Sequence, residues 1–217
     1  MNKGILIAGN DSALTSAIEN EAVNSDPAEQ YAITLIKNRF SETDSYRLPG
    51  AHILEWNPGS PISARTLVLA AENRLGIIDK AILVCDPPCS GQTISGLGLA
   101  DIEIMINDHI KGWFYLVKEL TAVFRERGEG ILALVYPEHT GKENTDLLGN
   151  TALAAFRSFA GSLLAVSAAE PYLAMGFAGG ETGDESGFAS FIFKQFEERN
   201  RRSSGKLFKY GKLHLFK

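Results

Sequence analysis

An apolar run at residues 4–8 ends in Gly9, and a segment with helical character, Ser12–Val23, follows it. A strand that turns into a helix presents free backbone N–H groups at the helix start, and these groups together with the helix dipole favour a phosphate. Only one glycine is present where phosphate loops of this kind usually have three, and Ala13 and Thr15 add side chains in the space that a pyrophosphate needs. The residues of this turn that could still contact a cofactor are Gly9, Asn10, Ser12 and Leu14.

Two other segments carry side chains suited to a dinucleotide. Lys37 and Arg39 follow a predicted strand at 31–36 and put positive charge where the 2′-phosphate of NADP would lie, although both also fit ordinary solvated charges. Asn57 follows a predicted strand at 52–56 and can hydrogen-bond an adenine. Since no acid follows residues 31–36 to hold a free ribose diol, the sequence favours NADP over NAD, with no cofactor as the alternative.

No catalytic residue is assigned from the sequence, but three side chains are candidate proton donors. Tyr136 and His139 lie in the polar stretch YPEHTGK after a predicted strand at 131–135, and His109 lies in a long predicted helix. Each also fits a plain structural role, because polar loops after strands often collect such residues and a helical histidine is often a partly buried core residue.

Strand-like and helix-like segments alternate along the chain. Several strands, such as 80–84 and 131–135, are nearly all apolar, which is typical of strands buried on both faces of a parallel sheet. The pattern predicts one Rossmann-like domain over residues 1–217, a doubly wound α/β sheet whose ligand crevice lies at the carboxyl ends of the strands. The expected strands are 4–8, 31–36, 52–56, 80–84, 131–135, 172–177 and 206–216, the last of which is one strand or a bent pair of strands around Gly211. The expected helices are 12–23, 60–76, 101–127, 151–169 and 188–199.

Read in order, the strand ends resemble the short-chain dehydrogenase/reductase family over nearly the whole chain. Residues 8–15 correspond to the family's TGxxxGxG motif, of which only Gly9 is kept, and Cys-Asp-Pro-Pro at 85–88 stands where Asn-Asn-Ala-Gly is usual. DHIKGWFYLVKEL resembles the central helix and places His109 at the position of the catalytic asparagine. GEGILALVYPEH resembles the fifth strand, with Tyr136 or a neighbour at the catalytic serine.

The segment NTALAAFRSFAGSLLA resembles the family's helix with the Tyr-xxx-Lys pair. One register puts Asn150 and Ala154 at those two positions and a shift of one gives Gly149 and Leu153, so neither supplies a tyrosine or a lysine. Proton transfer needs a group whose pKa can be tuned toward the working pH, and none of these four residues has one. The resemblance therefore implies a divergent member without standard dehydrogenase activity and with weak or absent dinucleotide binding.

Two alternatives remain from the sequence. One is an NADP-dependent oxidoreductase in which Tyr136 or His139 replaces the usual proton donor. The other is a non-catalytic scaffold or regulatory protein that uses the crevice for a different small molecule or for a protein.

The helices expected at 101–127 and 151–169 carry more apolar surface than one sheet face covers. In the first, Ile106, Ile110, Trp113, Val117, Leu120 and Phe124 form the stripe expected to face inward, and further apolar residues widen it. The surplus predicts a homodimer or homotetramer that pairs through these two helices. The family resemblance implies the same interface.

Composition excludes several classes of function. The formal net charge of −5 gives no general attraction to nucleic acid or to an anionic membrane, and no apolar run approaches the length of a membrane span. With two cysteines in CDPPC and four histidines, no metal site is predicted. The apolar run at the N-terminus is too short for a signal peptide, so we expect a cytoplasmic protein.

Overall fold

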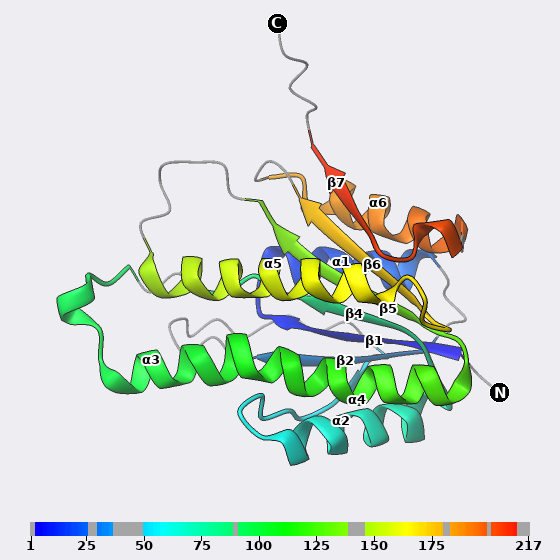
Figure 1. Ribbon diagram of the computed structural model, residues 1–217, viewed down its shortest axis with the longest axis horizontal. Coiled ribbons are helices and arrows are strands. Elements are labelled where there is room, and N and C mark those ends of the chain that lie inside the picture. Colours follow the sequence, from blue (N-terminus) through cyan, green and yellow to red (C-terminus); the bar gives the residue numbers. More distant parts are fainter. Residues whose placement is uncertain are drawn as a thin grey trace, which may run out of the picture.

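The computed structural model describes residues 3–25, 30–36, 50–88, 91–138, 146–179, 183–198 and 201–211. They form a seven-stranded sheet in the order β3-β2-β1-β4-β5-β6-β7. Every pair of neighbouring strands runs parallel (Figure 1). The chain builds outward from β1 to β3 and then returns to place β4 on the other side of β1, which confirms the predicted doubly wound sheet.

Helices alternate with the strands along the chain. The strands are β1 (Lys3–Asn10), β2 (Gln30–Ile36), β3 (His52–Ile53), β4 (Ile77–Val84), β5 (Ile131–Pro137), β6 (Leu173–Gly179) and β7 (Lys206–Tyr210). The α-helices are α1 (Ala13–Ser25), α2 (Pro61–Leu75), α3 (Leu99–Ile106), α4 (Gly112–Arg127), α5 (Leu147–Ser167) and α6 (Glu185–Glu198). Within the described ranges, no helix is long and apolar enough to cross a membrane.

The two faces of the sheet each have a separate apolar core, because successive side chains of a strand point to opposite faces. Ala8 of β1 and Leu83 of β4 belong to the core beneath α2, α4 and α5. Ile7 and Val84 belong to the core beneath α1 and α6. Figure 1 shows α2, α4 and α5 together on one side of the strands, with α1 and α6 on the other.

The ends of α2 follow from the sequence. The side chain of Ser60 accepts a hydrogen bond from the backbone N–H of Ser63, Pro61 occupies the first helical position, and Gly76 ends the helix at a positive φ of 78°. The first turn of a helix tolerates proline because a backbone N–H at that position would have no partner within the helix, and glycine adopts the positive φ without a Cβ penalty. Both predicted ends of this helix are confirmed.

The helices α5 and α6 begin at Leu147 and Glu185, a few residues before the expected starts at 151 and 188, and three other expected elements differ further from the structure. β3 has only two residues, His52–Ile53, rather than five, because the chain leaves the sheet edge after pairing briefly with β2. The expected helix 101–127 is divided by a π turn, Asn107–Lys111, into α3 and α4. β7 ends at Tyr210, and residues 212–216 of the expected last strand lie outside the described residues.

The π turn changes which residues of the long helix face inward. Ile106, expected in the apolar stripe, is 39% exposed, and Met105 is buried in its place. An extra residue in one helical turn rotates everything before it relative to everything after it. The expected inward positions from Trp113 to Phe124 are confirmed, because they all lie after the turn.

Candidate functional site

The strand order switches between β1 and β4, and the ligand crevice of a doubly wound sheet lies at the carboxyl ends of the strands there. Asn10 is the last residue of β1, and Cys85 and Asp86 directly follow β4. His109 lies in the middle of the π turn. The fold brings Asn10 and His109 together although 99 positions separate them in the chain.

The side chain of Asn10 crosses this crevice. Its Oδ1 accepts a hydrogen bond from the backbone N–H of Asp86 at 2.9 Å, and its Nδ2 lies 3.1 Å from Nδ1 of His109. Because a backbone N–H only donates, Asp86 fixes the orientation of the amide, and Nδ2 is therefore the donor to His109. Asn10 and His109 are each 3% exposed, so the two side chains fill the space between the strand ends and the helix.

Burial lowers the pKa of His109 from its ordinary 6.5 to about 4. Since Nδ1 accepts the hydrogen bond from Asn10, the hydrogen of the neutral imidazole is on Nε2. A group with this pKa is deprotonated at neutral pH and is a poor general acid. His109, one of the three candidate proton donors, therefore lies at the crevice but is already deprotonated at neutral pH, so it is unsuited to donate a proton to a substrate.

Thr15 occupies the space beside Gly9. A Cβ on Gly9 would lie 2.7 Å from Oγ1 of Thr15 and 3.1 Å from Cβ of Val84. The hydroxyl of Ser12 accepts a hydrogen bond from the backbone N–H of Thr15 at 3.3 Å, so one free N–H of the first turn of α1 already has a partner. Thr15 is 1% exposed, and the side chain of Leu14 is buried in the core beneath α1. The turn is thus closely packed where a pyrophosphate would need backbone contact.

The π turn rests on the loop that follows β3. A Cβ on Gly112 would lie 2.5 Å from Cβ of Pro58, and a Cβ on Gly59 would lie 3.3 Å from Cβ of Asn107. Asn57 is exposed, and its backbone N–H donates to Oγ of Ser63 at 2.8 Å. The loop and the helix are therefore in direct contact, and Asn57 stays at the surface.

Tyr136 lies in β5 and is 4% exposed. Its ring packs edge-on against Phe156 with centroids 6.2 Å apart, and the guanidinium of Arg157 lies 5.7 Å from the ring centre. Burial raises the pKa of Tyr136, and the positive charge of Arg157 partly opposes this. Glu138 forms ion pairs with Arg157 at 3.5 Å and with Lys209 at 3.0 Å. Tyr136 is accordingly an enclosed, protonated phenol.

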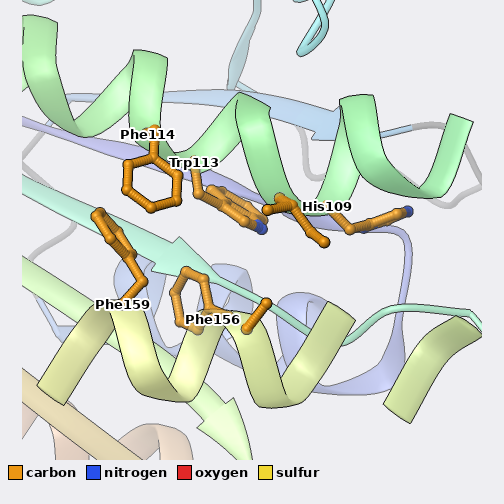
Figure 2. A pocket seen from close by; sticks show the side chains of 7 residues that line it. His109, Trp113, Phe114, Phe156 and Phe159 are labelled. Atoms are coloured by element: carbon orange, nitrogen blue, oxygen red, sulfur yellow. The ribbon is translucent and has the colours of Figure 1, made fainter. Parts of the chain in front are cut away.

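A small apolar hollow, partly open to solvent, lies between the long helix and α5. Figure 2 shows side chains of the upper helix and of α5 pointing toward one another across it. Trp113 packs against Phe156 with ring centroids 5.4 Å apart, and Phe114 against Phe159 at 4.4 Å. His109 borders the same hollow. The helix that carries His109 is thus held to α5 by aromatic contacts.

Several sequence-derived candidates cannot be placed in the site. Lys37, Arg39 and His139, as well as Cys89, lie outside the described residues.

Burial, with the negative charge of Asp86 as a second cause, raises the pKa of the Cys85 thiol well above its usual range, so it stays protonated. Among the residues that the structure describes, no three His, Cys, Asp or Glu side chains gather as a metal site would require.

Comparison with known proteins gives a result at the level of the fold. No family model and no curated protein matches the sequence. Among solved structures, the 3-ketoacyl-(acyl-carrier-protein) reductase of Brucella melitensis in complex with NADH aligns with a TM-score of 0.76, over 95% of this chain and 96% of its own, at 11% identity. The chain has the short-chain dehydrogenase/reductase fold.

Other structures with the short-chain dehydrogenase/reductase fold align as fully. A Bacillus thuringiensis protein assigned as a 3-oxoacyl reductase gives a TM-score of 0.74 over 99% of both chains at 12% identity. A protein of Aeromonas hydrophila subsp. hydrophila assigned to the short-chain dehydrogenase/reductase family gives 0.72 over 97% of this chain and 99% of its own, at 16% identity. At such identities the likeness concerns the fold.

Within the short-chain dehydrogenase/reductase fold, α5 is the helix that resembles the one with the Tyr-xxx-Lys pair. Gly149 and Leu153 are buried, whereas Ala154 is exposed. A Cβ on Gly149 would lie 3.1 Å from the carbonyl oxygen of Pro88, just after β4. The register with Gly149 and Leu153 therefore turns toward the crevice, and α5 contains neither tyrosine nor lysine at any position.

Two contacts of the site are not predicted by any pattern in the sequence. The backbone N–H of Asp86, which orients Asn10, has no signal in the sequence because it depends on the register between β1 and β4. Arg157, which lies over Tyr136, looks from the sequence like an ordinary exposed residue of α5. The crowding of Gly9 by Thr15, in contrast, follows from the missing glycine at position 15.

Proposed function

We propose that the chain is a short-chain dehydrogenase/reductase-fold protein without dehydrogenase activity, whose crevice is closed to dinucleotides. The observation that carries this proposal is the Asn10 side chain, which joins the Asp86 backbone to His109 across the switch point of the sheet. A dinucleotide must approach the backbone closely at this point. Any such ligand would have to displace two buried, hydrogen-bonded side chains.

The acid–base chemistry of the site supports the same conclusion. The inward face of α5 presents Gly149 and Leu153, which carry no proton to exchange. His109 is neutral at pH 7, and Tyr136 is buried beneath Phe156 and Arg157. Carbonyl reduction by hydride transfer requires a group that protonates the substrate oxygen in contact with it.

A fluorescence titration of the protein with NADPH and with NADH tests the proposal. We expect no saturable change up to about 1 mM, which corresponds to a binding free energy weaker than about −4 kcal/mol. The double variant Asn10→Ala/Thr15→Gly removes the amide that bridges the crevice and the side chain that packs on Gly9, so we expect it to bind NADPH at least about tenfold more tightly than the natural chain. Saturable binding of either nucleotide to the natural chain well below 1 mM would refute the proposal.

A specific contact favours one alternative, an NADP-dependent oxidoreductase. The guanidinium of Arg157 over the ring of Tyr136 is a positive charge beside a phenol, and it lowers the pKa of Tyr136 against the effect of burial. If Tyr136 and Arg157 act as the proton donor pair, the natural chain should oxidise NADPH in the presence of a carbonyl substrate, and the variant Tyr136→Phe should lose this activity. Since NADPH binding is a precondition, the same titration decides between the two proposals.

We also propose that the chain pairs with a second copy through the long helix and α5. Phe114 is 52% exposed although its ring packs against Phe159, and Val166 of α5 is 70% exposed. Exposed apolar side chains on neighbouring helices support a self-complementary surface, which is compatible with a two-fold dimer or with a tetramer.

A further inference from the structure

The amide of Asn10 has no freedom of orientation. Its oxygen is held by the N–H of Asp86, which cannot accept a hydrogen bond, so the NH₂ group must face Nδ1 of His109. This arrangement is compatible with only one state of the imidazole, the neutral ring with hydrogen on Nε2. If Nδ1 gained a proton, two donors would face each other, and turning the amide around would set its NH₂ against the N–H of Asp86 instead.

We propose that the Asn10–His109 bridge is a latch across the crevice, and that protonation of His109 releases it. The bridge connects the end of β1 to the π turn Asn107–Lys111, and through the Asn10 oxygen it also holds the segment that follows β4. Release separates the helix from the strand ends at the point between β1 and β4 where the strand order switches. The latch is a property of these contacts alone and holds whether or not the crevice ever takes a nucleotide.

The pH range of the release follows from linkage. In the closed state burial keeps the pKa of His109 at about 4, whereas a solvated imidazole has its ordinary pKa of 6.5. Opening therefore takes up a proton throughout this interval, and the ratio of open to closed molecules rises about tenfold for each pH unit of acidification. Above pH 6.5 both states are neutral and the ratio is constant; below about 4 both are protonated and it is constant again.

The surroundings of His109 leave burial as the cause of this shift. The face of α5 across the hollow presents Ala155, Phe156 and Phe159, none of which is charged. The loop 57–60 that supports the turn contains no titratable residue. The titratable and charged residues nearest to the bridge along the chain are Asp11 after β1, Cys85 and Asp86 after β4, Glu103 on α3, and Asp108 and Lys111 in the π turn itself. None of them contributes to the lowered pKa of His109, which has burial as its cause.

Asn10→Asp is the sharpest test, because it changes the charge of the latch and not its shape. A carboxylate accepts hydrogen bonds from both the Asp86 N–H and a protonated His109, so in this variant the protonated imidazole closes the latch. NMR titration of the histidine side chains should give a His109 midpoint near 4 in the natural chain and above 6.5 in Asn10→Asp. Amide hydrogen exchange of residues 99–111, corrected for intrinsic rates, reports the opening.

We expect exchange of residues 99–111 to accelerate about tenfold per pH unit between 6.5 and about 4 in the natural chain, and not in Asn10→Asp. A second variant, His109→Asn, keeps an acceptor for Asn10 but cannot titrate, so it should also lose the acceleration. His52→Asn, on the edge strand β3, is the matched control and should behave like the natural chain. The latch is disproved if His109 titrates near 6.5 in the natural chain, or if all four proteins open over the same pH range. Because no nucleotide is present, neither result bears on dinucleotide binding.

Discussion

A single amide side chain joins three elements at the crevice. If Asn10 is replaced by alanine, the N–H of Asp86 and the imidazole of His109 both lose a buried partner, and each such loss costs about 1–3 kcal/mol.

The strand that ends at Asn10 and the helix around His109 are predictable from hydrophobic patterning. Their meeting is not, because it depends on a contact across 99 residues and on a π turn that no periodicity reveals.

The packing of Gly9 against Thr15 gives a prediction at the same scale. Gly9→Ala would bring a methyl group within 2.7 Å of Oγ1 of Thr15, so we expect it to lower the free energy of unfolding by about 1–3 kcal/mol. The change Thr15→Gly in the Gly9→Ala background removes the clash and should restore part of that loss. Urea denaturation of the two single variants and the double variant measures the coupling. Strictly additive effects would show that the two residues do not compete for space.

The buried imidazole predicts a pH dependence of global stability. The pKa of His109 is lower in the folded chain, about 4, than in the unfolded chain, 6.5. The unfolded state therefore binds more protons between these values, so this contribution is fully present above pH 6.5 and is lost as the pH falls through about 4. It amounts to about 3 kcal/mol. Urea denaturation at pH 7 and pH 4 should show a smaller loss in His109→Asn than in the natural chain, and equal losses would contradict the assignment.

At the scale of elements, the π turn determines how the long helix meets the sheet. The apolar stripe predicted from a regular helix is confirmed for the residues that follow the π turn, where Trp113 and Phe124 are buried. It is wrong for the residues that precede the turn, where Met105 is buried and Ile106 is exposed. A regular period predicts inward positions only within an uninterrupted helix. No such interruption affects the buried positions predicted for the strands, because their apolar runs are short and bounded by glycine, proline or polar residues.

Two helical glycines should respond oppositely to alanine. Gly112→Ala would place a Cβ 2.5 Å from Cβ of Pro58, so we expect a loss of about 1–3 kcal/mol in unfolding free energy. Gly161→Ala in α5 meets no atom within 4 Å, and we expect a gain of about 0.5–1 kcal/mol from helix propensity. Thermal and urea denaturation of both variants compare them directly. A stabilising Gly112→Ala would mean that the helix does not rest on the loop after β3.

At the scale of the whole molecule, composition and strand patterning predicted a single parallel sheet, and the strand order confirms it. The same reasoning could not identify a ligand, since side chains at strand ends are set by chemistry that the fold does not dictate. What the fold adds is the place where those side chains must meet. In this chain that place is filled by Asn10 and His109.

The proposed pairing of two copies is tested by charge substitution. Phe114 and Leu69 are 52% and 51% exposed, but only Phe114 lies on the surface proposed to pair. Phe114→Lys should convert the oligomer to a monomer in size-exclusion chromatography with light scattering, because a charge would be buried at the interface without a partner. Leu69→Lys on α2 should leave the oligomer intact. A monomeric natural chain, or equal effects of the two variants, would exclude this interface.

The closed crevice is tested most directly by a crystal structure of the natural chain soaked with millimolar NADPH at neutral pH. We predict that Nδ2 of Asn10 remains about 3.1 Å from Nδ1 of His109, that Thr15 still packs on Gly9, and that no ordered dinucleotide is present at the ends of β1 and β4. An ordered nicotinamide and pyrophosphate in that position, with the Asn10 side chain displaced, would contradict the account.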